Sequence, residues 1–98
     1  MKRVTIYTTS YCAWSARAKD LLRSKRVYFD EIDVTGDFDA REKLMAMTGG
    51  ARTVPQVFVG DHHLGGYRDL IRLEEDGRLD ALLGIGVAES TEAVIQMS

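Results

Sequence analysis

Strand-like and helix-like segments alternate along the first 50 residues, and this alternation restricts the fold more than any other feature of the chain. Residues 3–8 (RVTIYT) and 27–34 (VYFDEIDV) are short and apolar enough to be strands. Between them, residues 13–25 carry apolar side chains at helical spacing, at Trp14, Ala18, Leu21 and Leu22. Because β-α-β units cross over in the right-handed sense, the two strands are predicted to be parallel.

A second helix is predicted after residue 36. Asp37 suits its N-cap, because a carboxylate there accepts a free backbone N–H of the first turn. Ala40, Leu44 and Met47 give the helix an apolar stripe, and Gly49–Gly50 ends it.

The second half of the chain predicts a hairpin and then a helix. Residues 55–60 (PQVFVG) are strand-like, residues 61–63 (DHH) suit a tight turn, and residues 64–66 (LGG) suit a short antiparallel partner strand. A helix is predicted from Tyr67, and residues 78–84 (RLDALLG) suit a further helical turn or two. The predicted order is β-α-β-α-β-β-α, an α/β fold with a four-stranded mixed sheet flanked by helices on both faces.

Length and charge limit the class of protein. The 98 residues suit one domain, which we place at residues 1–86, with residues 87–98 as a frayed or weakly helical tail. The net charge of −2, with both signs interspersed, makes nucleic acid an unexpected partner. No apolar run approaches the ~18 residues of a membrane span, and no signal peptide opens the sequence. A single cysteine then fits a reducing compartment, so we expect a cytoplasmic protein.

Cys12, the one cysteine, stands at the junction between the first strand and the first helix. Free N–H groups and the helix dipole stabilise an anion at such a position, and the thiolate is the reactive form of cysteine. The alternative is an inert buried cysteine, since free cysteine is among the most buried residue types. The residues alone leave both interpretations open.

Ser15 occupies the position where a dithiol redox site carries its second sulfur. A dithiol site attacks with one sulfur and releases its product with the other. A hydroxyl is too weak a nucleophile for the second role, although Ser15 can donate a hydrogen bond to Cys12 or to the first helical turn. A mixed disulfide on Cys12 therefore needs an external thiol for its release.

Two further segments could bind an extended peptide-like ligand. Pro55 forces Val54 toward an extended conformation, which leaves its N–H and C=O free to pair with a peptide. A cis bond before Pro55 would aim those groups outward, whereas the alternative is that Pro55 merely begins a strand. In GGYRDL (65–70), the glycines permit close approach, and Asp69 could either cap the helix or accept from an ammonium group.

Together the three motifs resemble those of the glutaredoxins, which have the thioredoxin-like fold. The motifs are a Cys-x-x-Cys/Ser site after the first strand, TVPQVFV (53–59) and GGYRDL (65–70), in this order and at these separations. The resemblance runs from about Val4 to Leu83. Each motif alone is weak, but the ordered set is specific, and thioredoxins proper lack the paired glycines.

The resemblance implies a role for each matching residue. Cys12 would be the nucleophile, and Trp14 would take the place of the usual tyrosine beside the glutathione sulfur. Pro55 would be cis and would leave the preceding backbone to pair with the cysteinyl unit. The other residues implied to bind glutathione are Thr9, Tyr11, Arg52 (or Arg41), Thr53, Val54, Gly66, Tyr67, Arg68 and Asp69.

The chain departs from the family pattern at four positions. Ala13 replaces the usual proline, Ser15 the second cysteine, Thr9 a frequent lysine, and Arg68 a small polar or acidic residue. The glycine-phenylalanine-serine site and the insertion of the monothiol branch are absent. The chain thus looks like a dithiol-class frame without its resolving cysteine.

Three functions remain open at this point. The first is a glutathione-dependent oxidoreductase that acts by a monothiol mechanism on glutathionylated proteins or small disulfides, as a monomer. The second is a homodimer that binds a [2Fe–2S] cluster through two Cys12 sulfurs and two glutathione sulfurs, since such clusters take four thiolates. The third is a redox-inactive adaptor. No other metal site is expected, because adjacent histidines at a turn, His62 and His63, are usually solvated.

Overall fold

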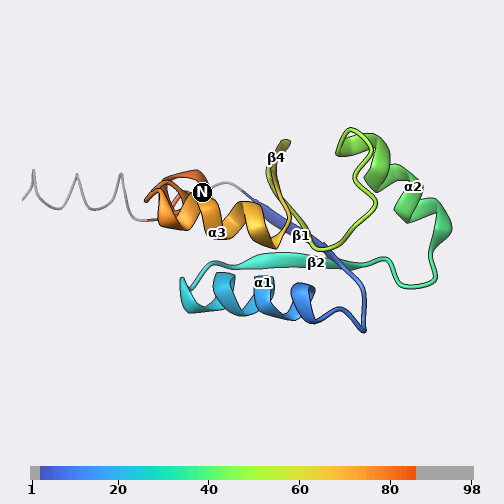
Figure 1. The fold of residues 1–98 in the computed structure, drawn as a ribbon, viewed down its shortest axis with the longest axis horizontal. Coiled ribbons are helices and arrows are strands. Elements are labelled where there is room, and N and C mark those ends of the chain that lie inside the picture. The colour runs from blue at the N-terminus through green and yellow to red at the C-terminus, as the bar shows by residue number, and fades with distance from the viewer. Residues whose placement is uncertain (1–2, 86–98) are drawn as a thin grey trace, which may run out of the picture.

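A computed structural model describes residues 3–85 (Figure 1). Its elements follow the predicted order, and the further helical turns predicted within residues 78–84 form a short helix of their own. They are β1 (Val4–Thr8), α1 (Ala13–Ser24), β2 (Phe29–Asp33), α2 (Phe38–Met47), β3 (Gln56–Val59), β4 (His62–Gly65), α3 (Tyr67–Glu75) and α4 (Leu79–Leu83). The proposed tail at residues 87–98 lies outside the described residues.

The four strands form one mixed sheet in the order β2-β1-β3-β4. β1 and β2 are parallel, as the β-α-β unit predicts, with Val4 opposite Phe29. β3 is antiparallel to both of its neighbours, β1 and β4. The predicted mixed sheet is therefore confirmed, and β1 lies in its interior with the Cys12 loop at its carboxyl end.

The main core lies between the sheet and three helices. Alternate residues of β1, Val4 and Ile6, point into this core, and the helices contribute Ala18 and Leu22 from α1, Leu70 from α3, and Leu79 and Leu83 from α4. Burial of these apolar side chains is the main force that holds α1 against α3 and the sheet. The start of α1, where Cys12 lies, is therefore fixed in place by this packing.

Helix α2 lies on the opposite face of the sheet. Thr5 and Tyr7 alternate with the core residues of β1 and so point away from the main core. Together with Phe58, they line a small cavity that Met47 of α2 also borders. Figure 1 shows α2 at the end of the molecule away from α3. Helices on both faces, as predicted, complete a thioredoxin-like arrangement.

Three local predictions met different outcomes. Asp37 is the N-cap of α2, and its carboxylate accepts the Ala40 N–H at 3.0 Å, as predicted. The apolar stripe of α2 is only partly right, because Leu44 is buried whereas Met47 is 48% exposed. The assignment of both histidines to the hairpin turn is wrong.

The hairpin turn falls earlier than predicted. Residues 60 and 61 make the turn, with Gly60 at a positive φ of 57°. Both histidines consequently belong to β4. A glycine adopts this backbone conformation at no steric cost, which lets the chain reverse before residue 62.

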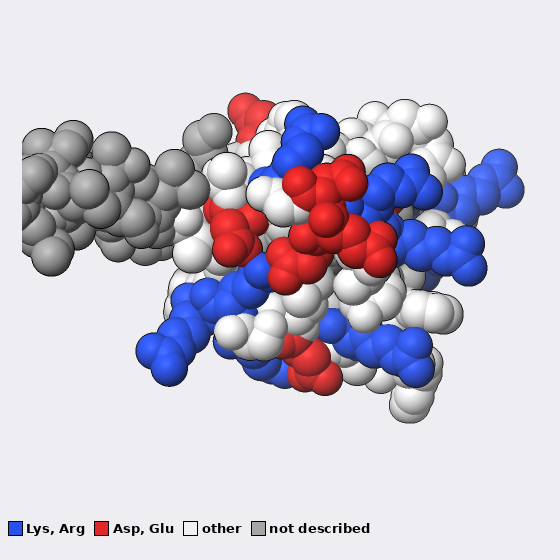
Figure 2. All heavy atoms as spheres, turned by 60° about the vertical axis from the view of Figure 1, so that its left-hand side comes forward, with Lys and Arg blue, Asp and Glu red and all other residues white. Residues whose placement is uncertain are grey.

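Charges of both signs lie side by side on the surface. Figure 2 shows acidic side chains gathered at the centre of one face, with basic side chains around them. Within residues 3–85, no helix has both the length and the apolar character needed to cross a bilayer.

Candidate active site

Cys12 is the N-cap residue of α1. Its backbone is extended (φ −101°, ψ 113°), and its carbonyl accepts the first helical hydrogen bond from the Ala16 N–H at 3.2 Å. The side chain is partly exposed, and no acidic residue stands in the first turn of the helix. The free N–H groups of that turn therefore face the sulfur without a competing carboxylate.

These groups lower the pKa of Cys12. Burial of the sulfur acts in the opposite direction and raises the pKa, but four hydrogen-bond donors outweigh it. In order of effect, these donors are the Ser15 N–H, the Ser15 hydroxyl, the Trp14 N–H and the Thr9 hydroxyl. The shift makes the thiolate more abundant at neutral pH, which favours the reactive over the inert interpretation of Cys12.

Within residues 3–85, no cation takes part in this stabilisation. The Arg17 guanidinium lies over the Trp14 ring, 4.9 Å from its centroid. Lys19 instead binds the Glu31 carboxylate at 3.1 Å. Backbone and hydroxyl dipoles at the helix start, rather than a salt bridge, therefore favour the thiolate.

Ser15 stands in the first turn of α1, three residues after Cys12, and is 1% exposed. Its Oγ atom has no hydrogen-bond partner among the described residues. A buried hydroxyl without a partner is unfavourable, and the thiolate of Cys12 is a much stronger acceptor than the neutral thiol, whose sulfur accepts only weakly. The lowering of the Cys12 pKa by this hydroxyl thus requires the O–H to turn toward the sulfur when the thiolate forms.

The loop before β3 approaches the sulfur from the other side. Cys12 Sγ donates to the Val54 carbonyl oxygen at 3.6 Å. The Val54–Pro55 peptide bond is cis, as the resemblance implies. Cys12 and the proline loop are therefore in direct contact.

A cavity of about 520 Å³ opens beside this contact. This volume is within the ~300–1,000 Å³ typical of ligand sites. α1 contributes Trp14 to its wall, and the proline loop contributes Thr53, Val54 and Pro55. The start of α3 also lines it, with Gly66, Tyr67, Arg68 and Asp69. Eight of the predicted site residues thus surround one groove, next to Cys12.

Close packing explains the two glycines at the end of the groove. The Asp69 carboxylate caps α3 by accepting the Gly66 N–H at 2.9 Å. A Cβ atom on Gly65, whose φ is +115°, would collide with that carboxylate. A Cβ on Gly66 would come within 3.3 Å of the Pro55 carbonyl oxygen. The capping role of Asp69 is therefore confirmed.

The aromatic wall of the groove consists of Trp14 and Tyr67. Their ring centroids are 5.6 Å apart and the rings are tilted by 42°. This separation is within the range of favourable aromatic pairs. The pair joins the start of α1 to the start of α3 beside the groove.

Three predicted residues lie outside this groove. Thr9 contributes its hydroxyl to the thiol instead. Tyr11 is 96% exposed and does not shield the sulfur. Arg52 lines a neighbouring cavity of about 360 Å³ with Arg41, whose guanidinium donates to the Arg52 carbonyl oxygen at 3.3 Å.

Two residues of the groove were not predicted from the sequence. Gln56 is buried and lines the groove. The signal in the sequence that could have indicated this is its position directly after Pro55. Arg72 lies one helical turn beyond Arg68, and the (i, i+4) spacing places both on one face of α3.

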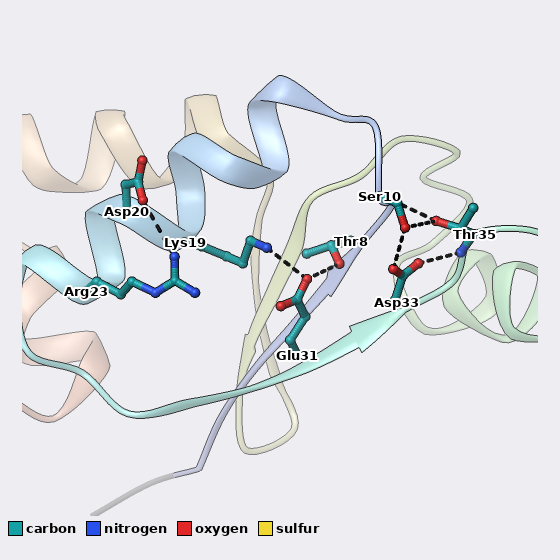
Figure 3. A network of polar contacts seen from close by, with 8 residues as sticks. All are labelled: Thr8, Ser10, Lys19, Asp20, Arg23, Glu31, Asp33 and Thr35. Atoms are coloured by element: carbon teal, nitrogen blue, oxygen red, sulfur yellow. Dashed lines mark hydrogen bonds and ion pairs between the residues drawn. The ribbon is translucent and has the colours of Figure 1, made fainter.

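A polar network fixes the loop that carries Cys12 (Figure 3). Ser10 donates its N–H to Thr35 Oγ1 at 2.8 Å and its hydroxyl to Asp33 Oδ2 at 2.7 Å. The Thr35 N–H donates to Asp33 Oδ1 at 2.8 Å. The Thr35 hydroxyl lowers the pKa of Asp33 most, followed by the Thr35 N–H and the Ser10 hydroxyl. The network ties the Cys12 loop to the end of β2.

Comparison with known proteins agrees with this geometry. The family model described as glutaredoxin matches residues 4–64, which is more than half of the chain. The chain belongs to the glutaredoxin family. It is 48% identical to a glutaredoxin of Pseudomonas aeruginosa over 83 residues, which are 85% of this chain and 98% of the relative.

Solved glutaredoxin structures resemble the fold closely. The solution structure of the Brucella melitensis glutaredoxin has a TM-score of 0.77 at 43% identity and covers 88% of this chain and 92% of its own. A buckwheat glutaredoxin–glutathione complex also has a TM-score of 0.77, at 28% identity, and covers 85% and 77% of the two chains. Glutaredoxins are glutathione-dependent thiol oxidoreductases, and this chain shares their family and fold.

Proposed function

We propose that this glutaredoxin transfers glutathione between thiols through Cys12 alone. The Cys12 thiolate attacks the glutathione sulfur of a glutathionylated protein, forms a Cys12–glutathione disulfide and releases the protein thiolate. A second glutathione thiolate then attacks the glutathione sulfur of this disulfide. It regenerates the Cys12 thiolate and leaves as oxidised glutathione. Each step makes one S–S bond and breaks one, so electrons and charge balance.

The observation that carries this proposal is the position of a single sulfur, that of Cys12, beside the groove that Val54 lines. The whole sequence contains a single cysteine, and the lowered pKa of Cys12 favours its reactive form. Ser15 fills the position of a second sulfur with a buried hydroxyl that cannot release a mixed disulfide. The chain therefore depends on a second glutathione, and reactions that need two enzyme sulfurs are expected to be slow.

The groove supplies complementary groups for a tripeptide. The backbone at Thr53 and Val54, beside the cis-proline, would pair with the cysteinyl unit, and Trp14 would pack beside the sulfur. The free N–H groups at the start of α3 suit the γ-glutamyl carboxylate, since helix starts bind anions. Gly66, Tyr67, Arg68 and Asp69, which line the groove, would surround that end.

The remaining contacts would lie outside the main groove. Arg52, with Arg41 beside it, would meet the glycyl carboxylate in the neighbouring cavity. Thr9 would act through the thiolate, and Tyr11 would reach glutathione only from its exposed position. Each of these assignments is part of the proposal.

Intact mass spectrometry tests the mechanism directly. After incubation with oxidised glutathione, the protein is expected to gain one glutathionyl group, and Cys12→Ala is expected to gain none. Cys12→Ala should also lose deglutathionylation of a glutathionylated peptide. Retained turnover in that variant would refute the assignment.

The Ser15→Cys variant tests the monothiol aspect separately. A second sulfur would allow release of the mixed disulfide within the chain, so reduction of protein disulfides should increase. Deglutathionylation should change little, because it needs only Cys12. An unchanged rate with protein disulfides would contradict the explanation.

The second candidate is the [2Fe–2S] homodimer, favoured by Ala13 in the place of the usual proline. A cluster takes four thiolates, and one chain supplies only Cys12, so two chains and two glutathione molecules would be required. Among residues 3–85, no other group of His, Cys, Asp and Glu suits a metal ion. Anaerobic reconstitution with iron, sulfide and glutathione would give a coloured dimer if this candidate is right and a colourless monomer if it is wrong.

A further inference from the structure

The side chain of Gln56 is a buried amide with a partner at each end. Gln56 is 4% exposed and begins β3, directly after the cis-proline. Its Nε2 donates to the Thr53 carbonyl oxygen at 3.0 Å, and its Oε1 lies 2.6 Å from Nε2 of His63 on β4. A buried amide is costly unless both ends are paired, and here both are.

The chemistry of the partners fixes the direction of each hydrogen bond. A carbonyl oxygen only accepts, so the amide group facing Thr53 must be the NH₂. Oε1 therefore faces His63, whose Nε2 must carry the hydrogen. The His63 ring also stacks on Phe58, with centroids 4.9 Å apart and planes tilted by 33°. The His63 ring is thus held by its hydrogen bond to Gln56 and by its contact with Phe58.

This chain of hydrogen bonds ends inside the groove. Thr53 lines the groove, and the next residue, Val54, accepts from the Cys12 sulfur. On the other side, a Cβ on Gly66 would come within 3.9 Å of Gln56 Nε2. The amide therefore lies between the proline loop and the glycine turn, which are the two walls of the groove.

We propose that His63 and Gln56 are positioning residues that fix the proline loop for glutathione. His63 orients the Gln56 amide, and the amide sets the direction of the Thr53 carbonyl and so of the backbone that follows it. This inference rests on the proposed glutathione-transfer function. It gives a role to His63, which the sequence alone does not connect with Cys12.

Two substitutions break the chain of hydrogen bonds at different points. Gln56→Glu keeps the size of the side chain but directs an acceptor at the Thr53 carbonyl. His63→Leu removes the donor and leaves Gln56 Oε1 unpaired. His62→Leu is the matched control, because His62 is the exposed neighbour on the same strand and makes no side-chain hydrogen bond within residues 3–85. His63→Gln restores an amide donor.

The measurements separate binding from thiol reactivity. We expect the KM for a glutathionylated peptide to rise about fivefold in His63→Leu and about tenfold in Gln56→Glu, as for loss of one buried hydrogen bond. The equilibrium constant for Cys12 glutathionylation in glutathione redox buffers should fall by similar factors. Alkylation of Cys12 by iodoacetamide should keep its rate, because Thr53 is not among the donors that lower the Cys12 pKa. His62→Leu should match the wild type, and His63→Gln should recover most of the affinity.

Each outcome decides between the inference and the function it rests on. A wild type that is glutathionylated while both variants keep its KM would overturn the positioning role and leave the proposed function intact. An equal loss in His62→Leu, or no recovery in His63→Gln, would also overturn the role. A wild type that takes up no glutathione would overturn the proposed function and the inference together.

Discussion

Cys12 Sγ donates its hydrogen to the Val54 carbonyl oxygen across 3.6 Å, although the two residues are 42 positions apart in the sequence. The contact joins the start of α1 to the proline loop. When the thiol ionises, its hydrogen is lost and the carbonyl has no donor. Ionisation of Cys12 therefore frees the acceptor that the proposed glutathione contact requires.

The first prediction concerns the pH dependence of Cys12 alkylation. The pKa of this thiol is lowered by the N–H groups of the first helical turn and by the hydroxyls of Ser15 and Thr9, against the effect of burial. The rate of iodoacetamide alkylation should reach its midpoint at a lower pH in the folded protein than in urea. Thr9→Val should move the midpoint upward, whereas Thr5→Val, on the far face of the sheet, should not. Equal midpoints in the folded and unfolded chain would contradict the prediction.

The second prediction concerns the buried hydroxyl of Ser15. Ser15→Ala removes a polar group that has no partner among residues 3–85 while Cys12 is a neutral thiol, so at a pH below the pKa of Cys12 the free energy of unfolding should increase by about 1 kcal/mol. The pKa of Cys12 should rise, because one donor to the thiolate is lost. Urea denaturation and the alkylation profile measure the two effects. Ser24→Ala, at the exposed end of the same helix, should change stability by less than ~0.5 kcal/mol.

The order of the elements could be predicted from the sequence because each signal is local. Strand composition, helical spacing and the Asp37 cap fix the elements, and the ordered motifs predict the groove. The contact between Gln56 and His63 could not be predicted. A bulge in the β3–β4 pairing places Val57 opposite Gly65 but Phe58 opposite His63, so the register is irregular. Which residue of β4 faces Gln56 depends on this irregularity and on the early turn at Gly60.

The third prediction concerns stability in acid. The Glu31 carboxylate accepts from the Thr8 hydroxyl at 2.6 Å and from Lys19 at 3.1 Å (Figure 3), and these contacts lower its pKa although burial raises it. A carboxyl whose pKa is lower in the folded state stabilises the protein above its ordinary pKa of about 4.3. This contribution is lost as the pH falls through the folded pKa.

Urea denaturation of Glu31→Gln checks this dependence. At pH 7 the variant should be less stable than the wild type by about 1 kcal/mol, since the site is partly exposed. The difference should shrink as the pH falls below about 4.3. Glu42→Gln is the control, because Glu42 is exposed and makes no ion pair within residues 3–85. A difference that stays constant with pH would exclude Glu31 as a source of acid sensitivity.

The last prediction concerns the glycine turn at the end of the groove. Gly65→Ala places a Cβ against the Asp69 carboxylate at a φ of +115°, so both the backbone and the cap of α3 must move. The free energy of unfolding should fall by about 3 kcal/mol. Gly60→Ala is the matched control: its φ is also positive, but its Cβ would meet open space, so the loss should be about 1 kcal/mol. Only Gly65→Ala should weaken Cys12 glutathionylation, because only that residue supports the Asp69 wall of the groove. An equal cost in both variants would show that backbone conformation, rather than the approach of Asp69, makes glycine necessary at residue 65.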